Sequence, residues 1–141
     1  MLGEERLAWL RELPRVQMQG PMALVHASPE STWRAPEPEA SDGELESVYG
    51  PLAQPVTVYG HIHRSFIRSV PGRRIVANAG SVSLSYDGDH RATYLLLDES
   101  TPSIRRVQYD VDTEVNALSR CGNPHAAWIA MMLASARPQM P

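Results

Sequence analysis

Two strand-like segments that each end at histidine constrain the fold of this chain more than any other feature. The run Val-Thr-Val-Tyr at 56–59 has the composition of a buried β-strand, and Gly-His-Ile-His follows at 60–63. The run Met-Ala-Leu-Val at 22–25 is also of strand length, and His26 follows it directly. Gly60 permits a sharp change of direction because it has no Cβ. Open α/β sheets place their sites at the carboxyl ends of strands, so the pattern predicts an α/β fold with a histidine site at that edge.

His61 and His63 are separated by one residue. In extended chain, side chains two positions apart point the same way, so we expect both imidazoles to reach one ligand. Neutral imidazole is the commonest protein ligand for zinc-like metals. A lone His-x-His pair is weak evidence for a metal site, and the alternative that these histidines are ordinary core or loop residues stays open at this point.

The composition excludes several classes of protein. A chain of 141 residues suits one domain. Its 13 basic and 16 acidic residues are well mixed, so we expect no binding to a nucleic-acid backbone, which needs a basic face. No apolar run reaches the roughly 20 residues that cross a bilayer, and the charges throughout 1–15 do not resemble a secretory signal. We therefore expect a cytoplasmic protein without membrane contact.

Turn signals and hydrophobic periodicity predict two hairpins and three helices around these strands. The hairpins pair 65–70 with 73–77 and 91–98 with 103–109, and the helices cover 3–13, 113–120 and 125–136. In the first helix Leu7, Trp9 and Leu10 form an apolar stripe, which we expect to pack on a sheet.

Residues 30–45 are rich in Pro, Glu, Ser and Asp and show no hydrophobic period. They predict a mobile surface loop. Trp33 lies within this loop. Its indole either packs back as an anchor or projects towards a substrate, and we favour packing.

Three short motifs resemble those of the calcineurin-like metallophosphoesterases. They are Leu-Val-His-Ala-Ser-Pro at 24–29, Tyr-Gly-His-Ile-His at 59–63 and Asn-Ala-Gly-Ser-Val at 78–82. The bacterial phosphodiesterase-like branch of that family has His-Gly-Ser-Pro, Gly-His-Thr-His and Asn-Pro-Gly-Ser-Val at the corresponding places. The strand at 91–98 and the opening segment at 7–14 also look like that branch, so the resemblance covers nearly all of the chain.

That resemblance implies a fold, a site and a reaction. The fold is a two-sheet sandwich flanked by helices, with two divalent metal ions of the Mn, Zn, Fe or Ni class at the strand ends. The implied site comprises metal-binding histidines and a supporting loop: His26 and His61 at one metal, His63 at the other, and Asn78, Gly80 and Ser81 in the loop. Two close cations suit hydrolysis of a phosphomonoester or phosphodiester because they lower the pKa of a bound water and neutralise the phosphate.

Other motifs of that family are missing before His26. The family has Asp-x-His, Gly-Asp and Gly-Asn-His-Asp there, which provide the remaining ligands, the bridging aspartate and the catalytic histidine; this sequence has none of them. We therefore expect a single C-terminal half-domain over 1–141, with at most one bound metal and no assignable catalytic residue. The run Asp-Gly-Asp-His at 87–90 predicts a hairpin turn rather than a substitute set of ligands.

The missing motifs leave two functions open. In the first, the chain is part of a metal-dependent phosphoester hydrolase whose N-terminal half is missing, and it contributes His26, His61 and His63. In the second, it is a catalytically inactive, degenerate or truncated family member that acts as a binding module. Without its neighbours one sheet would expose strand edges and apolar surface, so we expect self-association or association with the missing half.

Overall fold

The structure, a computed structural model, describes residues 2–98 and 101–140. The helices of these residues are α1 (Glu4–Arg11), α2 (Asp42–Tyr49), α3 (Val111–Leu118) and α4 (Ala126–Ser135), with a 3₁₀ turn at Gly50–Leu52. The strands are β1 (Val16–Gln19), β2 (Met22–Val25), β3 (Val56–Tyr59), β4 (Phe66–Val70), β5 (Arg74–Asn78), β6 (Ala92–Asp98) and β7 (Thr101–Val107). The α/β class is confirmed, and so are both hairpins, which pair β4 with β5 and β6 with β7.

The larger sheet has the strand order β1-β2-β3-β5-β4. Its three inner strands run parallel, and Tyr59 is paired with both Val25 and Asn78. The edge strands β1 and β4 are antiparallel to their neighbours. Because parallel strands end at the same edge of a sheet, the segments that follow β2, β3 and β5 emerge together.

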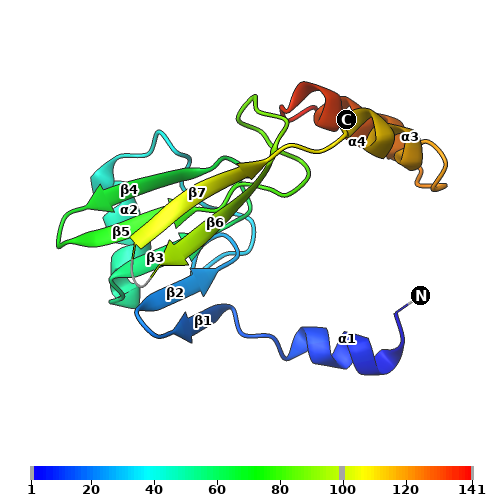
Figure 1. The fold of residues 1–141 in the computed structure, drawn as a ribbon. Coiled ribbons are helices and arrows are strands. Elements are labelled where there is room, and N and C mark those ends of the chain that lie inside the picture. The colour runs from blue at the N-terminus through cyan, green and yellow to red at the C-terminus, as the bar shows by residue number, and fades with distance from the viewer. Residues whose placement is uncertain (1, 99–100, 141) are drawn as a thin grey trace.

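The main core lies between this sheet and α2, which covers its rear face in Figure 1. The buried members of this core are Val25, Leu45, Tyr49, Tyr59, Val70 and Val76. The rings of Tyr49 and Tyr59 stack with their centroids 5.0 Å apart. Their hydroxyls donate to the carbonyl oxygens of Ala27 and Pro36, each at 2.6 Å. The core therefore holds the segment after β2 as well as the sheet itself.

Helix α2 begins inside the segment that the sequence predicts to be a loop. Ser41 is its N-cap, with the side chain accepting a hydrogen bond from the amide of Glu44 at 3.1 Å. Leu45, in the first turn, is fully buried in the core. The predicted loop of 30–45 is therefore wrong at its end, because its last four residues are helical. Its mobility stays a prediction.

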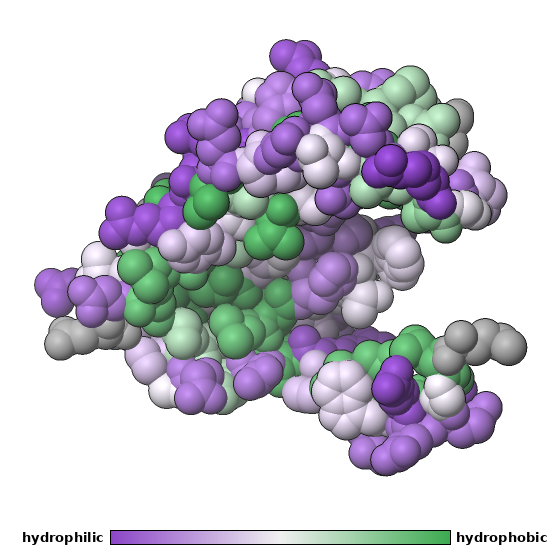
Figure 2. All heavy atoms as spheres, turned by 45° about the vertical axis from the view of Figure 1, so that its right-hand side comes forward, coloured by the Kyte–Doolittle hydropathy of each residue, from purple (hydrophilic) through white to green (hydrophobic). Residues whose placement is uncertain are grey.

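The two-stranded sheet crosses the face of the larger sheet opposite α2 (Figure 1). The amide of Thr93 on β6 donates to the carbonyl oxygen of Ser81 at 2.8 Å, which joins the two sheets. Leu24 and Val58, whose neighbours along the strand face the α2 core, are only partly buried on this face. Figure 2 shows apolar surface gathered on the left of that view, beside the gap that opens between the arm that carries α1 and the rest of the molecule. The predicted two-sheet sandwich is confirmed, with a second sheet of two strands in the described residues.

Helix α1 does not pack on a sheet, so that prediction is wrong. None of its residues is buried, and Trp9 and Leu10 are 61% and 43% exposed. Figure 1 shows the helix extending away from both sheets. Apolar periodicity identifies a helix, whereas burial requires another element to lie against its apolar side.

Helices α3 and α4 pack on each other, and α4 contacts the loop between β5 and β6. The amide of Gly88 donates to the carbonyl oxygen of Ala136 at 3.0 Å, and the hydroxyl of Tyr86 lies 3.4 Å from the sulfur of Met132. None of the helices in the described part of the chain has the length and apolar character that crossing a bilayer requires.

Candidate metal centre

Two of the predicted ligands, His26 and His61, are brought into contact at the carboxyl ends of neighbouring strands. His26 follows β2, and Gly60 and His61 follow β3. The amide of Gly60 donates to the carbonyl oxygen of His26 at 2.9 Å, so the two segments stay side by side beyond the sheet. Nε2 of His26 and Nδ1 of His61 are 3.3 Å apart, and the ring centroids are 5.1 Å apart.

The carbonyl group of Trp33 determines which nitrogen of His61 carries a hydrogen. Nε2 of His61 lies 3.1 Å from this carbonyl oxygen, which only accepts hydrogen bonds, so Nε2 is the donor. In the neutral ring Nδ1 then carries the lone pair, and it faces Nε2 of His26. Either His26 donates a hydrogen bond to this lone pair, or both nitrogens present lone pairs to a cation.

The separation of these two nitrogens fits a shared metal ion. Nitrogens bound at about 2.0–2.1 Å to one tetrahedral zinc-like ion lie roughly 3.3–3.4 Å apart. The observed distance between Nε2 of His26 and Nδ1 of His61 is 3.3 Å. The contact of His61 with the Trp33 carbonyl is also typical, because ligating histidines commonly donate their other ring N–H to a carbonyl group or carboxylate. The pair therefore suits two adjacent positions around one cation.

His63, the third predicted ligand, is oriented by partners of its own. Its Nδ1 lies 2.7 Å from the carbonyl oxygen of Leu84, and its ring stacks on Tyr86 with the centroids 4.8 Å apart. Burial lowers the pKa of His63 below its ordinary value, although the hydrogen bond to Leu84 favours the charged ring. The ring is therefore neutral at pH 7, and Nε2 is its lone-pair nitrogen.

The backbone between the histidines is a tight turn, not the extended chain that we expected. His61 and His63 have φ angles of +67° and +55°, in the left-handed region that residues other than glycine rarely adopt. The amide of Ile62 donates to the carbonyl oxygen of Gly60 at 2.8 Å. The expected extended backbone at 61–63 is therefore wrong, and the left-handed φ angles belong to the histidines rather than to Gly60. Such strain is most often found where function requires it.

Asn78 joins this turn to the end of β5. Its side chain is fully buried; Nδ2 donates to the carbonyl oxygen of Gly60 at 2.6 Å, and Oδ1 accepts from the amide of Gly80 at 2.9 Å. Gly80 has a φ angle of +76° and lies close to β6. Of the predicted supporting loop, Asn78 and Gly80 thus stand beside the histidine turn, whereas the carbonyl group of Ser81 faces β6.

Comparison with known proteins supports the fold. No protein-family model and no curated protein sequence matches this chain. Its structure is similar to that of a metallophosphoesterase from Sphaerobacter thermophilus, with a TM-score of 0.77 and 22% identity over 96% of this chain and 64% of that one. It is also similar to hypothetical protein PH1004 from Pyrococcus horikoshii OT3, with a TM-score of 0.77 and 18% identity over 94% of this chain and 54% of that one.

The chain has a metallophosphoesterase-like fold. It spans just under two thirds of the Sphaerobacter protein and just over half of the Pyrococcus protein. At these identities the likeness extends to the fold alone. The roles that the sequence motifs imply for individual residues therefore depend on the geometry of the site.

Among the described residues, carboxylates do not join the histidines into a metal-binding group. Within residues 2–98 and 101–140, no group of three or more His, Cys, Asp and Glu side chains is placed to hold a metal ion. Residues 87–90 lie in the connection between β5 and β6, two strands that belong to different sheets, so the predicted hairpin turn is wrong. Asp87 accepts hydrogen bonds from Ser85 at 2.8 Å and from Arg106 at 2.6 Å, and Asp89 is paired with Arg91 at 2.6 Å.

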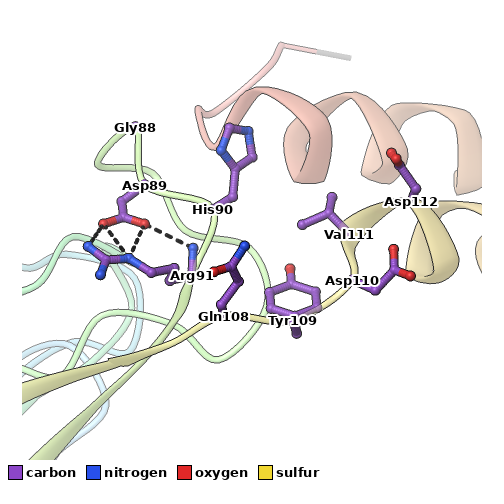
Figure 3. Close-up of a pocket in the computed structure, with 9 residues that line it drawn as sticks. All are labelled: Gly88, Asp89, His90, Arg91, Gln108, Tyr109, Asp110, Val111 and Asp112. Atoms are coloured by element: carbon purple, nitrogen blue, oxygen red, sulfur yellow. Dashed lines mark hydrogen bonds and ion pairs between the residues drawn. The ribbon is translucent and has the colours of Figure 1, made fainter.

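Figure 3 shows a surface pocket formed by residues 88–91 and 108–112. Asp89 and Arg91 form a hydrogen-bonded ion pair along one side of the pocket. Nε2 of His90 lies 2.8 Å from the carbonyl oxygen of Ala134 on α4. None of the three predicted ligands lines this pocket, so its polar groups hold the loop and helix together rather than extend the candidate metal centre.

Sequence reasoning missed the residues that orient the histidines. The carbonyl groups of Trp33 and Leu84 hold the rings of His61 and His63, and Tyr86 stacks on His63. Every residue has a carbonyl group, so no pattern of residue types identifies the ones that face a histidine. The contact depends on where the loop lies.

Proposed function

We propose that this chain is part of a metal-dependent phosphoester hydrolase in which His26 and His61 hold one divalent cation. The observation that carries this proposal is the 3.3 Å separation of Nε2 of His26 and Nδ1 of His61. The metallophosphoesterase-like fold supports it. His63, neutral and oriented by the Leu84 carbonyl, would serve a second ion whose other ligands come from outside the described residues. For the described residues alone we propose one ion.

The substrate would be a phosphomonoester or phosphodiester, and the similarity of the motifs to the bacterial phosphodiesterase-like branch favours a diester. A bound cation of this class lowers the pKa of a water molecule and offsets the charge of a phosphate. The residues of this chain position the ligands. The Trp33 carbonyl holds the ring of His61, and the side chain of Asn78 holds the turn that carries it.

A binding module without catalysis is the second candidate function. The observation that favours it is the lack of any group of three metal-binding side chains in the described part of the chain. A two-histidine site with open positions binds a cation and an anion more readily than it completes hydrolysis, because no general acid or base has been placed beside it among the described residues.

Calorimetric titration with Zn²⁺ or Mn²⁺, beside hydrolysis of an aryl phosphodiester, tests both functions. We expect close to one ion per chain, and we expect His61→Ala to weaken its binding by more than about a hundredfold. His125→Ala is the matched control, because His125 is an exposed histidine at the start of α4. Hydrolysis that disappears in His61→Ala supports the hydrolase, and binding without hydrolysis supports the module. Unchanged metal affinity in His61→Ala contradicts both.

A further inference from the structure

Trp33 contacts the candidate metal centre with its side chain as well as its carbonyl group, and yet its indole is exposed. Its ring centroid lies 5.9 Å from that of His61, with the two planes at 85°. The residue is 82% exposed. The expectation that this indole packs back as an anchor is therefore wrong. A tryptophan in this position leaves much of its roughly 150–250 Å² of surface in water, which packing does not explain.

The main chain presents this indole in a defined place. The hydroxyl oxygen of Ser31 accepts hydrogen bonds from the amides of Trp33 and Arg34, at 3.1 Å and 3.0 Å. Ser31 is itself held, because its amide and carbonyl group bond the carbonyl group and amide of Ser28. The carbonyl group of Trp33 accepts from His61. Both main-chain polar groups of Trp33 are therefore occupied, and the exposure of its side chain does not come from a frayed segment.

The other tryptophans differ from Trp33 in their surroundings. Trp128 is partly buried, and its indole N–H donates to the carbonyl oxygen of Gln139 at 3.0 Å. Trp9 is 61% exposed on α1, which extends away from the sheets (Figure 1). Among the described aromatic contacts, Trp33 is the tryptophan that lies against a predicted metal-binding histidine.

We propose that Trp33 determines substrate specificity by stacking on a planar aromatic group of the phosphoester. This inference rests on the proposed function, in which the phosphate is bound at His26 and His61. The group esterified to that phosphate would then lie a few bond lengths from the ion, within reach of an indole centred 5.9 Å from the His61 ring. An indole that is 82% exposed has at least one face open for stacking. The planar group is an aryl ring or a nucleobase, since both stack on indole.

Paired ligands that differ only in the planar group test this inference. The full chain, with Mn²⁺ present, is titrated calorimetrically with phenyl phosphate and ethyl phosphate, and with adenosine monophosphate and ribose phosphate. We expect the ligand with the planar group to bind at least about tenfold more tightly in one or both pairs. The first pair reports an aryl group and the second a nucleobase. Trp33→Ala should abolish the preference, and Trp33→Phe should keep most of it.

Trp33→Ala also removes the ring contact with His61, so the preference is taken within each variant as the ratio of the two ligand affinities, which a general loss of Mn²⁺ or phosphate binding does not change. Trp9→Ala is the matched control and should keep the preference. A preference that survives in Trp33→Ala, or wild-type protein without any preference, overturns the inference while leaving the proposed function intact. If no phosphate ligand binds in a Mn²⁺-dependent manner, the proposed function fails and this inference fails with it.

Discussion

Positive φ angles at His61 and His63 are the least expected feature at the scale of single residues. An L-residue with a Cβ in this region costs roughly 1–2 kcal/mol, so two in one turn require compensation from their surroundings. Asn78 provides part of it, because its buried amide bonds the carbonyl oxygen of Gly60 and the amide of Gly80. The strained turn and the buried amide therefore form one unit.

Gly80 provides a test of how tightly this unit is packed. A Cβ at Gly80 would lie 3.0 Å from the Cβ of Ser65 and 3.0 Å from side-chain atoms of Thr93, at a φ angle of +76°. We expect Gly80→Ala to lower the free energy of unfolding by about 2–4 kcal/mol, measured by urea denaturation. Gly88→Ala is the matched control, because its φ angle is +83° and nothing lies within 4 Å of its added Cβ.

In Gly88→Ala the free energy of unfolding should fall only by the cost of a left-handed φ angle for alanine, roughly 1–2 kcal/mol. Equal losses of stability in the two variants would contradict the close packing of Gly80 against Ser65 and Thr93. A shift of the His61 ring resonances in Gly80→Ala, absent from Gly88→Ala, would show that the packing reaches the histidine turn through Asn78.

At the scale of elements, one arginine joins the hairpin β6–β7 to the loop before it. Arg106 of β7 is paired with Asp87 at 2.6 Å and donates to the hydroxyl of Ser65 at 2.8 Å. It also lies 3.3 Å from Asp89. A two-stranded hairpin is marginally stable by itself, so its place across the larger sheet depends on contacts of this kind.

We expect low pH to break the ion pair between Arg106 and Asp87. Burial alone would raise the pKa of Asp87, but hydrogen bonds from Arg106 and Ser85 outweigh it and lower the pKa to about 2 from the ordinary value of 3.8. The folded pKa lies below the unfolded one, so the contribution of Asp87 is complete above about pH 4 and is lost as the pH falls towards 2. We expect that contribution to be roughly 1–2 kcal/mol in the free energy of unfolding.

Urea denaturation between pH 7 and pH 2 measures this loss. Asp87→Asn should be less stable than wild type at pH 7, and the difference should shrink as the pH falls to 2. Asp98→Asn is the control for removal of one negative charge, because Asp98 is exposed at the end of β6. A constant difference between Asp87→Asn and wild type over the whole range would contradict the role given to this carboxylate.

The described molecule as a whole leaves apolar surface uncovered. On the outer face of the hairpin, Tyr94, Leu96 and Val107 are 44%, 43% and 50% exposed. Figure 2 shows a further apolar area on the left of that view. In the described residues β6 and β7 pair only with each other, so each also has an unpaired edge. Exposed apolar surface next to open strand edges favours association.

We expect the purified chain to self-associate through this hairpin. Light scattering coupled to size-exclusion chromatography, over two orders of magnitude in concentration, should show the average mass rising towards that of a dimer. Leu96→Arg should shift the rise to higher concentration, because a charge opposes burial of that face. The matched control is Leu10→Arg on α1, where the side chain is 43% exposed. A concentration-independent monomer would contradict the expectation.

The sequence by itself determined where most of the helices and strands lie. Runs of β-branched and apolar residues predicted β2 and β3, and turn residues predicted the hairpins β4–β5 and β6–β7. These signals are local, because strand propensity and turn chemistry depend on neighbouring residues. The motifs that begin at His26 and Gly60 also indicated the metallophosphoesterase-like fold, which the solved structures support.

Only the tertiary structure decided which side chains are buried and which of them come into contact. It left α1 without buried residues, began α2 inside the predicted loop, and placed the strain at His61 and His63 rather than at Gly60. It also brought His26 within 3.3 Å of His61 and exposed the indole of Trp33 beside them. Each of these depends on contacts between segments far apart in the chain. A local pattern specifies what a segment forms, whereas burial and side-chain direction depend on what lies against it.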